Sequence, residues 1–225
     1  MNKIISFIVL CFVSFAVQAE SSIVQSEGMK LRLEQVAADL GIPWGMSFIS
    51  SNHLLVTDRN GPVRRVDIDT GKITPLKNVP EVLAEGQAGM LDVAISPRFE
   101  KDGWIYFTYV KDIDGLGATV LARAKLSSDT FSSWQELLVT DSVTTTSRHY
   151  GSRIAFDEEG HVFFSVGDRG VRDNAQDLTN HAGSIMRLNL DGSVPGDNQY
   201  KQNKKLLPEV WSYGHRNPQG LAYDG

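Results

Sequence analysis

The chain has 225 residues, with 27 Asp and Glu against 22 Lys and Arg and a formal net charge of −5 at pH 7. This mildly acidic balance argues against nucleic acid as a partner, because nucleic-acid binding depends on clustered basic side chains. The single cysteine, Cys11, lies in the predicted signal peptide described next, so we expect neither disulfide bonds nor thiol chemistry in the mature protein.

The first 19 residues have the features of a secretory signal peptide. A short basic start (residues 1–3) precedes an apolar run over residues 4–17, and Val17 and Ala19 occupy the −3 and −1 positions for cleavage after Ala19. The run is too short for a comfortable membrane span and has no charged stop-transfer flank. We therefore predict a secreted, periplasmic protein without stable membrane insertion, whose propeller domain comprises residues 20–225.

Short segments of β type follow one another along the mature chain, separated by turns rich in Gly, Asp, Asn and Pro. Their enrichment in β-branched and aromatic residues predicts antiparallel sheet. No segment keeps a helical apolar period for long, apart from a turn or two between Pro80 and Gly86. The predicted strands cover residues 53–58, 62–67, 73–76, 104–109, 119–126, 136–140, 153–156 and 162–166.

A glycine opens a strand at four places, which indicates a weak internal repeat. These glycines are Gly45, Gly89, Gly151 and Gly220, spaced by 44, 62 and 69 residues. Such spacings suit four-stranded propeller blades with loop insertions. A plain β-sandwich is the alternative, but it does not predict a glycine at the start of each unit. We therefore predict an all-β protein with the fold of a β-propeller.

The fourth predicted unit has only one strand before the sequence ends at Gly225. A propeller closes only when its blades surround a common axis, and an open ring leaves sheet faces and an edge uncovered. We therefore expect this sequence to be part of a longer protein.

His149 and Asp168 are the leading candidates for catalysis. His149 precedes the strand-opening Gly151, so we expect it at the inner mouth of a blade, where a histidine can act as a general base near neutral pH. Asp168 ends the next strand, and antiparallel pairing can bring its carboxylate back to His149. That carboxylate would fix the imidazole tautomer and stabilise the imidazolium formed by proton uptake. The alternatives are a histidine in a surface loop and an ordinary turn aspartate.

A second group of polar side chains could bind a ligand at the same mouth. Arg216 can make a forked contact with carboxylate or quinone oxygens, and Asn217 and Gln219 add neutral donors. Gln87 lies at the equivalent position of an earlier unit, although it reads equally well as an ordinary loop amide. Together with a histidine held by a carboxylate, these donors suit a redox cofactor that is anionic and rich in oxygen.

The remaining motifs make weaker candidates. We interpret His181 as a packing or turn residue, and His53 and His161 as exposed turn residues before apolar strands. Residues 112–115 hint at calcium but lack the later ligands of an EF-hand loop. The sequence has no zinc spacing, no phosphate-binding glycine loop and no nucleophile elbow, which disfavours nicotinamide and nucleotide chemistry.

In combination, several segments resemble the soluble glucose/sorbosone dehydrogenase family, especially its bacterial aldose sugar dehydrogenases, which use pyrroloquinoline quinone (PQQ). The resemblance extends from about Pro43 to the end of the sequence. It implies a six-bladed propeller, of which this chain covers the first half to two-thirds, with the cofactor over the central mouth. The matching segments are residues 86–94, 149–170, 172–178, 191–195 and 208–222.

The resemblance also implies roles for individual residues. His149 matches the family's catalytic base and Asp168 the carboxylate that orients it, while residues that contact PQQ are matched by Gln87, Arg216 and Asn217. The implied reaction converts an aldose to its aldonolactone: His149 takes the anomeric hydroxyl proton, the C1 hydride passes to the quinone C5, and an external acceptor removes the electrons. Arg216 and a bound Ca2+ would stabilise the charge that develops on the quinone oxygen.

The family's calcium ligands and remaining PQQ contacts would lie beyond Gly225, so we expect the chain as written to hold an incomplete site. Two other functions stay open. A propeller lactonase would need converging Glu, Asn and Asp ligands for a central divalent metal, and a non-catalytic propeller would use the same surface to bind carbohydrate or protein.

Overall fold

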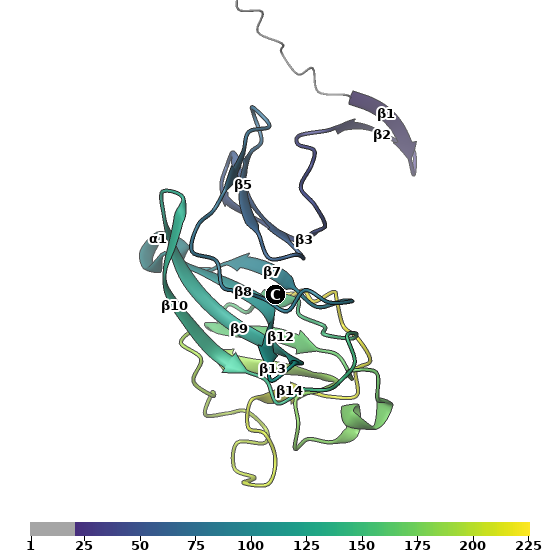
Figure 1. The fold of residues 1–225 in the computed structure, drawn as a ribbon, viewed down its shortest axis with the longest axis vertical. Coiled ribbons are helices and arrows are strands. Elements are labelled where there is room, and N and C mark those ends of the chain that lie inside the picture. Colours follow the sequence, from purple (N-terminus) through teal and green to yellow (C-terminus); the bar gives the residue numbers. More distant parts are fainter. Residues whose placement is uncertain (1–20) are drawn as a thin grey trace, which may run out of the picture.

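The computed structural model describes residues 21–225, so the predicted signal peptide, residues 1–19, lies outside the described residues. The described chain is almost entirely β (Figure 1). Its strands form three four-stranded antiparallel sheets and one two-stranded sheet, and in each sheet the strands pair in chain order. Residues 21–225 contain no helix with the length and hydrophobicity of a membrane span.

The three four-stranded sheets are called blades 1, 2 and 3. Blade 1 contains β3 (Pro43–Ser50), β4 (His53–Asp58), β5 (Val63–Asp67) and β6 (Ile73–Pro75). Blade 2 contains β7 (Met90–Ile95), β8 (Trp104–Ile113), β9 (Leu116–Ser127) and β10 (Thr130–Val139). Blade 3 contains β11 (Ile154–Phe156), β12 (His161–Val166), β13 (Ser184–Asn189) and β14 (Val210–Ser212).

Blade 2 is packed between the other two blades, and the sequence of β8 shows why. Successive side chains of a strand point to opposite faces of its sheet. On β8, Ile105 and Phe107 belong to the core shared with blade 1, whereas Tyr106 belongs to the core shared with blade 3. Both faces of the strand are therefore buried, which explains its nearly continuous apolar sequence. The first strands of the three blades lie next to one another, since β3 and β11 both contact β7.

The shorter elements lie outside the blades. The helix α1 (Phe99–Asp102) lies between β7 and β8 and ends at Gly103, which has a left-handed φ of 66°. A 3-10 helix, η1 (Arg172–Gln176), follows β12. The hairpin of β1 (Ser21–Ser26) and β2 (Met29–Glu34) is exposed along its whole length and lies apart from the blades in Figure 1.

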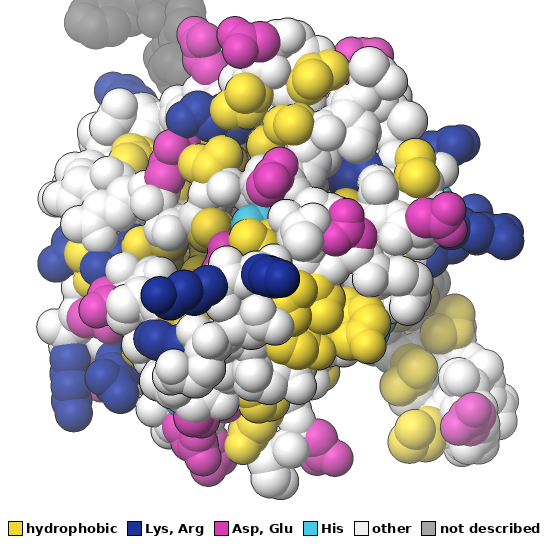
Figure 2. Space-filling view, turned by 90° about the horizontal axis from the view of Figure 1, so that it is seen from below, with side chains coloured by type: hydrophobic (Ala, Val, Ile, Leu, Met, Phe, Trp, Pro, Cys, Tyr) yellow, Lys and Arg dark blue, Asp and Glu magenta, His cyan; other side chains and the backbone are white. Residues whose placement is uncertain are grey.

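The outer face of blade 3 has no described strand against it. Ala155, Phe163, Trp211 and Tyr223 line a hollow there, and Trp211 and Tyr223 are exposed. Figure 2 views the molecule from below, the end occupied by blade 3 in Figure 1, and shows hydrophobic side chains gathered between charged ones on this face.

The prediction of an all-β propeller built from four-stranded antiparallel blades is confirmed, and three blades are complete. Every strand predicted between residues 53 and 166 is present, and β8, β9 and β10 extend beyond the predicted limits. Two secondary-structure predictions are wrong. Residues 80–86 contain no helical turn, and the segment around Gly220 forms no strand. A strand needs a hydrogen-bonded neighbour for its backbone groups, and no described segment pairs with residues 219–223.

Candidate active site

The five predicted site residues all lie on loops at one end of the blades. Gln87 precedes β7, His149 precedes β11, Asp168 follows β12, and Arg216 and Asn217 follow β14. Hydrogen bonds join these four loops to one another. We call this end of the molecule the mouth.

His149 and Asp168 form the closest contact at the mouth. The ring Nδ1 of His149 lies 2.6 Å from Oδ1 of Asp168, and their side chains are only 14% and 3% exposed. The same Oδ1 accepts a hydrogen bond of 2.7 Å from the backbone N–H of Gly170. A carboxylate in this position selects the tautomer that carries its proton on Nδ1. Nε2 has no hydrogen-bond partner among residues 21–225, so it is available to a ligand.

The backbone around this pair is tightly constrained. His149 has a left-handed φ of 60°, a conformation in which histidine is more frequent than most residues. A Cβ atom on Gly167 would lie 2.4 Å from the carbonyl oxygen of His149 and 2.9 Å from that of Arg216. The N–H of Asp168 donates to the same Arg216 oxygen at 2.8 Å. The approach of these loops therefore requires glycine at position 167.

Gln87 and Asn217 hold the backbone on either side of the histidine ring. Oε1 of Gln87 accepts from the N–H of His149 at 2.7 Å, and Oδ1 of Asn217 accepts from the N–H of Gly151 at 3.1 Å. Both amide oxygens therefore accept hydrogen bonds within the protein. The NH2 groups of Gln87 and Asn217 remain as donors, and they have no hydrogen-bond partner in the described part of the chain. Each amide can thus position His149 and still donate to a ligand.

Arg216 brings a positive charge to the mouth. Its side chain is exposed and forms no ion pair or hydrogen bond within residues 21–225. Of its neighbours, His215 is held by the protein, since its Nε2 lies 2.8 Å from the hydroxyl of Ser212. Arg216 therefore adds a positive charge to the NH2 group of Asn217 on the same loop, and both are available to an anionic ligand.

Sequence reasoning missed an ion pair between a half-buried arginine and a buried carboxylate, which ties the blades together near the mouth. Arg153 donates to Oδ1 of Asp92 at 2.7 Å, and its guanidinium lies 4.6 Å from the ring centre of Trp44. Burial raises the pKa of Asp92 and outweighs the hydrogen bonds from the Ile154 N–H and from Arg153, which lower this pKa. The sequence signal that could have revealed this ion pair is the position of Asp92 inside an apolar strand, because a carboxylate is rarely buried without a partner.

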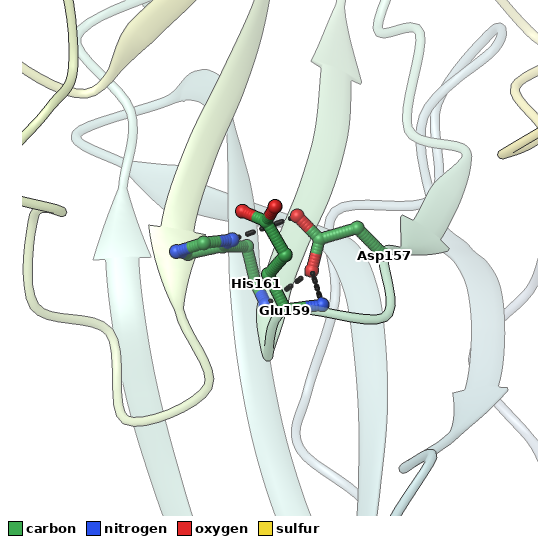
Figure 3. A group of neighbouring side chains, drawn as sticks. All are labelled: Asp157, Glu159 and His161. Carbon is green, nitrogen blue, oxygen red and sulfur yellow. Dashed lines mark hydrogen bonds and ion pairs between the residues drawn. The ribbon is translucent and has the colours of Figure 1, made fainter. Parts of the chain in front are cut away.

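Asp157, Glu159 and His161 form a cluster that resembles a metal site (Figure 3). A cation of the protein itself, the guanidinium of Arg187, lies beside this cluster. Nδ1 of His161 lies 2.7 Å from Asp157, and Nη2 of Arg187 lies 3.2 Å from both ring nitrogens. The prediction that His161 is an exposed turn residue is wrong, since its side chain is 12% exposed. Sequence reasoning could not place Arg187 beside it, because this arginine comes from a different strand.

This second histidine–aspartate pair lies far from the mouth. It occupies the turn between β11 and β12, whereas His149 precedes β11 and Asp168 follows β12. The turn is therefore at the opposite end of these antiparallel strands. Burial opposes ionisation of Asp157, but hydrogen bonds from the backbone and ring of His161 outweigh it and lower the pKa of this carboxyl.

His181 is buried, in agreement with its interpretation as a packing residue. Its Nδ1 accepts from the N–H of Asp141 at 2.8 Å, and its Nε2 lies 2.7 Å from Oε1 of Glu209. Both ring nitrogens are thus used within the protein. Burial opposes ionisation of Glu209, but the contact with His181 outweighs it and lowers the pKa of this carboxyl.

Comparison with known proteins shows the family of this chain. The model of the family described as Glucose / Sorbosone dehydrogenase matches residues 40–225. Aldose sugar dehydrogenase YliI of Escherichia coli is 36% identical over 203 residues, which are 85% of this chain and 53% of that protein. The crystal structure of the soluble aldose sugar dehydrogenase of E. coli in its apo-form has a TM-score of 0.79 at 31% identity, covering 92% of this chain and 57% of that one.

A further solved structure is the PQQ-bound form of aldose sugar dehydrogenase from Streptomyces coelicolor. It has a TM-score of 0.72 at 27% identity and covers 92% of this chain and 58% of that one. The chain thus spans about half the length of the curated relatives and solved structures that it matches. Because the family model matches almost all of the described residues, the chain belongs to the glucose/sorbosone dehydrogenase family.

Proposed function

We propose that the full-length protein containing this sequence oxidises the anomeric carbon of aldose sugars to aldonolactones with PQQ as cofactor. The observation that carries the proposal is the His149–Asp168 pair, which leaves Nε2 of the histidine open at the mouth. The aldose sugar dehydrogenases among its relatives, one of them solved with PQQ, support the cofactor and the class of substrate.

The donors at the mouth fit an anionic, oxygen-rich quinone. Arg216 supplies an unpaired guanidinium, and Gln87 and Asn217 supply amide N–H groups that their own contacts leave unused within residues 21–225. We assign these three residues to PQQ, because forked and charge-assisted donors bind carboxylate and quinone oxygens well. When bound, PQQ supplies the two-electron acceptor for the hydride of the sugar.

His149 serves as the general base in this proposal. Its Nε2 takes the proton of the anomeric hydroxyl, and the imidazolium that forms keeps its Nδ1–H on Asp168. The carboxylate stabilises this positive charge and holds the ring in place. Because Asp168 is 3% exposed, water screens the attraction less than it would at a surface.

Calcium, secretion and electron transfer complete the proposal. One cluster of three possible metal ligands is found in the described chain, and the positively charged side chain of Arg187 lies beside it. Because this charge would repel a cation, we place the calcium ligands outside the described residues. We further propose that residues 1–19 direct secretion to the periplasm and that an external acceptor reoxidises the cofactor.

The test is reconstitution of the full-length protein with PQQ and calcium, followed by aldose oxidation with an artificial electron acceptor. We expect His149→Ala to lower kcat by about 10³-fold, the usual range for a lost general base. The matched control is His53→Ala, which removes a half-exposed histidine of blade 1 and should leave kcat within about twofold. Activity that is independent of PQQ, or lactone hydrolysis abolished by a chelator, would favour the lactonase instead.

A further inference from the structure

Arg169 has the largest of the fully buried side chains in the described chain, and the hydrogen bonds that this side chain donates go to backbone oxygens. Its Nε donates to the carbonyl of Ser142 at 3.1 Å, and Nη2 donates to the carbonyl of Thr146 at 2.8 Å. Nη1 donates to the carbonyl of Arg148, and Nη2 also approaches that of Gly117 at 3.4 Å. Three of these four oxygens belong to the loop that carries His149.

The guanidinium also contacts the residue after the histidine. Its Cζ lies 3.5 Å from the ring centre of Tyr150, a cation–π distance, and Tyr150 is itself buried. Arg169 therefore holds the backbone oxygen of residue 148 and the ring of residue 150, which are the two neighbours of His149.

A buried cation of this kind is costly for the protein. Burial lowers the pKa of Arg169, and no carboxylate within residues 21–225 accepts a hydrogen bond from it. An apolar side chain of similar volume would fill the same space without the cost of removing a charge from water. What an apolar side chain cannot supply is a fork of donors that fixes several carbonyl groups at once.

We infer that Arg169 is a positioning residue for His149, an inference that rests on the proposed function. Two adjacent residues share the positioning of this histidine, since Asp168 fixes the imidazole ring and Arg169 holds the backbone oxygen of Arg148 and the ring of Tyr150 on either side of it. The left-handed φ of 60° at His149 persists because these contacts define it, and with it the direction of Nε2 toward the mouth. A purely structural role in packing blade 3 is the competing explanation.

The first experiment compares two buried arginines in the full-length protein reconstituted with PQQ and calcium. Arg169→Met removes the donors at the mouth, and Arg187→Met removes a guanidinium that is equally shielded but lies at the opposite end of blade 3, stacked on Trp211. We expect Arg169→Met to lower kcat by about 10- to 100-fold with KM for the aldose and PQQ affinity within about threefold, because a base displaced by an ångström loses about this much. Arg169→Lys should recover part of kcat, and Arg187→Met should lower the melting temperature but keep kcat.

The second experiment needs no activity. In cofactor-free full-length protein, the proton on Nδ1 of His149 should give a downfield NMR resonance, assigned by its loss in His149→Gln. We expect this resonance to move upfield or broaden in Arg169→Met, to a smaller extent in Arg169→Lys, and to persist in Arg187→Met.

An unchanged resonance in the arginine-169 variants would overturn the inference, and so would equal losses of kcat in Arg169→Met and Arg187→Met. If Arg169→Met does not fold, the resonance and kcat of Arg169→Lys decide. A His149→Ala protein with normal kcat would contradict the proposed function alone, because the resonance still reports whether Arg169 positions the ring.

Discussion

Three histidines in or beside blade 3 contact a carboxylate at nearly the same distance, yet only one is suited to catalysis. The distances are 2.6 Å for His149 to Asp168, 2.7 Å for His161 to Asp157 and 2.7 Å for His181 to Glu209. What differs is the second ring nitrogen. In His161 the second ring nitrogen is contacted by Arg187, and in His181 it accepts a hydrogen bond from the N–H of Asp141. In His149 the second ring nitrogen has no hydrogen-bond partner among residues 21–225.

The mouth pair and the turn pair also differ in what holds them. Asp157 and His161 lie four residues apart in one hairpin turn, and the same carboxylate accepts from the His161 N–H at 2.8 Å. His149 and Asp168 come from separate loops, and the contact requires a left-handed histidine and a glycine at 167. A local pair of this type stabilises its turn, whereas a pair held by strained backbone is more typical of a functional site. The predictions below test this contrast.

The largest difference should come from removing the charge of each aspartate in turn. In the full-length, reconstituted protein we expect Asp168→Asn to lower kcat by about 10³-fold, because an amide no longer fixes the tautomer or stabilises the imidazolium. Asp157→Asn should leave kcat within about twofold. Steady-state kinetics measures both, and comparable losses in the two variants would show that the mouth pair has no special role.

The next effect concerns the close approach of the loops at the mouth. A Cβ at position 167 meets backbone oxygen atoms at 2.4 and 2.9 Å, so Gly167→Ala must displace His149 or the loop of Arg216. We expect kcat to fall about 10- to 100-fold, a loss typical of small misplacements of catalytic groups. The control is Gly196→Ala, where no heavy atom lies within 4 Å of the added carbon. Normal kcat in Gly167→Ala would mean that the loops tolerate a wider spacing.

The sequence could predict the blades and the meeting of His149 with Asp168, but not the contact of Arg187 with His161. The apolar sequence of β8 and the glycine spacing predict blades because strand periodicity and turns are local properties. The position of Asp168 at the end of the strand that follows His149 predicts their meeting, since adjacent antiparallel strands return to the same end. Arg187, in contrast, reaches His161 across strand pairing, and no local pattern reveals that contact.

Arg169 shows a different limit of sequence reasoning. From the sequence, Asp168 in the segment from Gly167 to Gly170 could be an ordinary turn aspartate, and nothing there assigns a role to Arg169. In the structure, the loop of residues 142–150 folds over it and buries it completely, and backbone oxygens of that loop accept from its guanidinium. Burial of a charged side chain by a distant loop depends on tertiary structure, so composition and spacing could not predict it.

A smaller effect is expected on stability, and it depends on pH. The folded-state pKa of Asp157 is below its ordinary value of 3.8, so its ionised form stabilises the native state above the unfolded-state pKa, and this stabilisation is lost as pH falls through the folded-state pKa. In the full-length protein, Asp157→Asn should lower the free energy of unfolding by about 1 kcal/mol at pH 7. The difference from wild type should disappear in acid below both pKa values. Urea titrations at neutral and acidic pH measure it, and a difference independent of pH would mean that the ionic form of Asp157 contributes nothing.

The smallest effect should come from Glu159, the third member of the cluster in Figure 3. Its side chain is 74% exposed and lies 3.8 Å from Arg187, so Glu159→Gln should change the free energy of unfolding by less than about 0.5 kcal/mol. If the cluster bound a divalent cation, loss of this carboxylate would weaken binding, and calcium would stabilise wild type more than the variant. We expect equal stabilisation by calcium in the two full-length proteins, because Arg187 already supplies the positive charge. A calcium-dependent difference in melting temperature between wild type and Glu159→Gln would show that calcium displaces the guanidinium of Arg187 from the cluster.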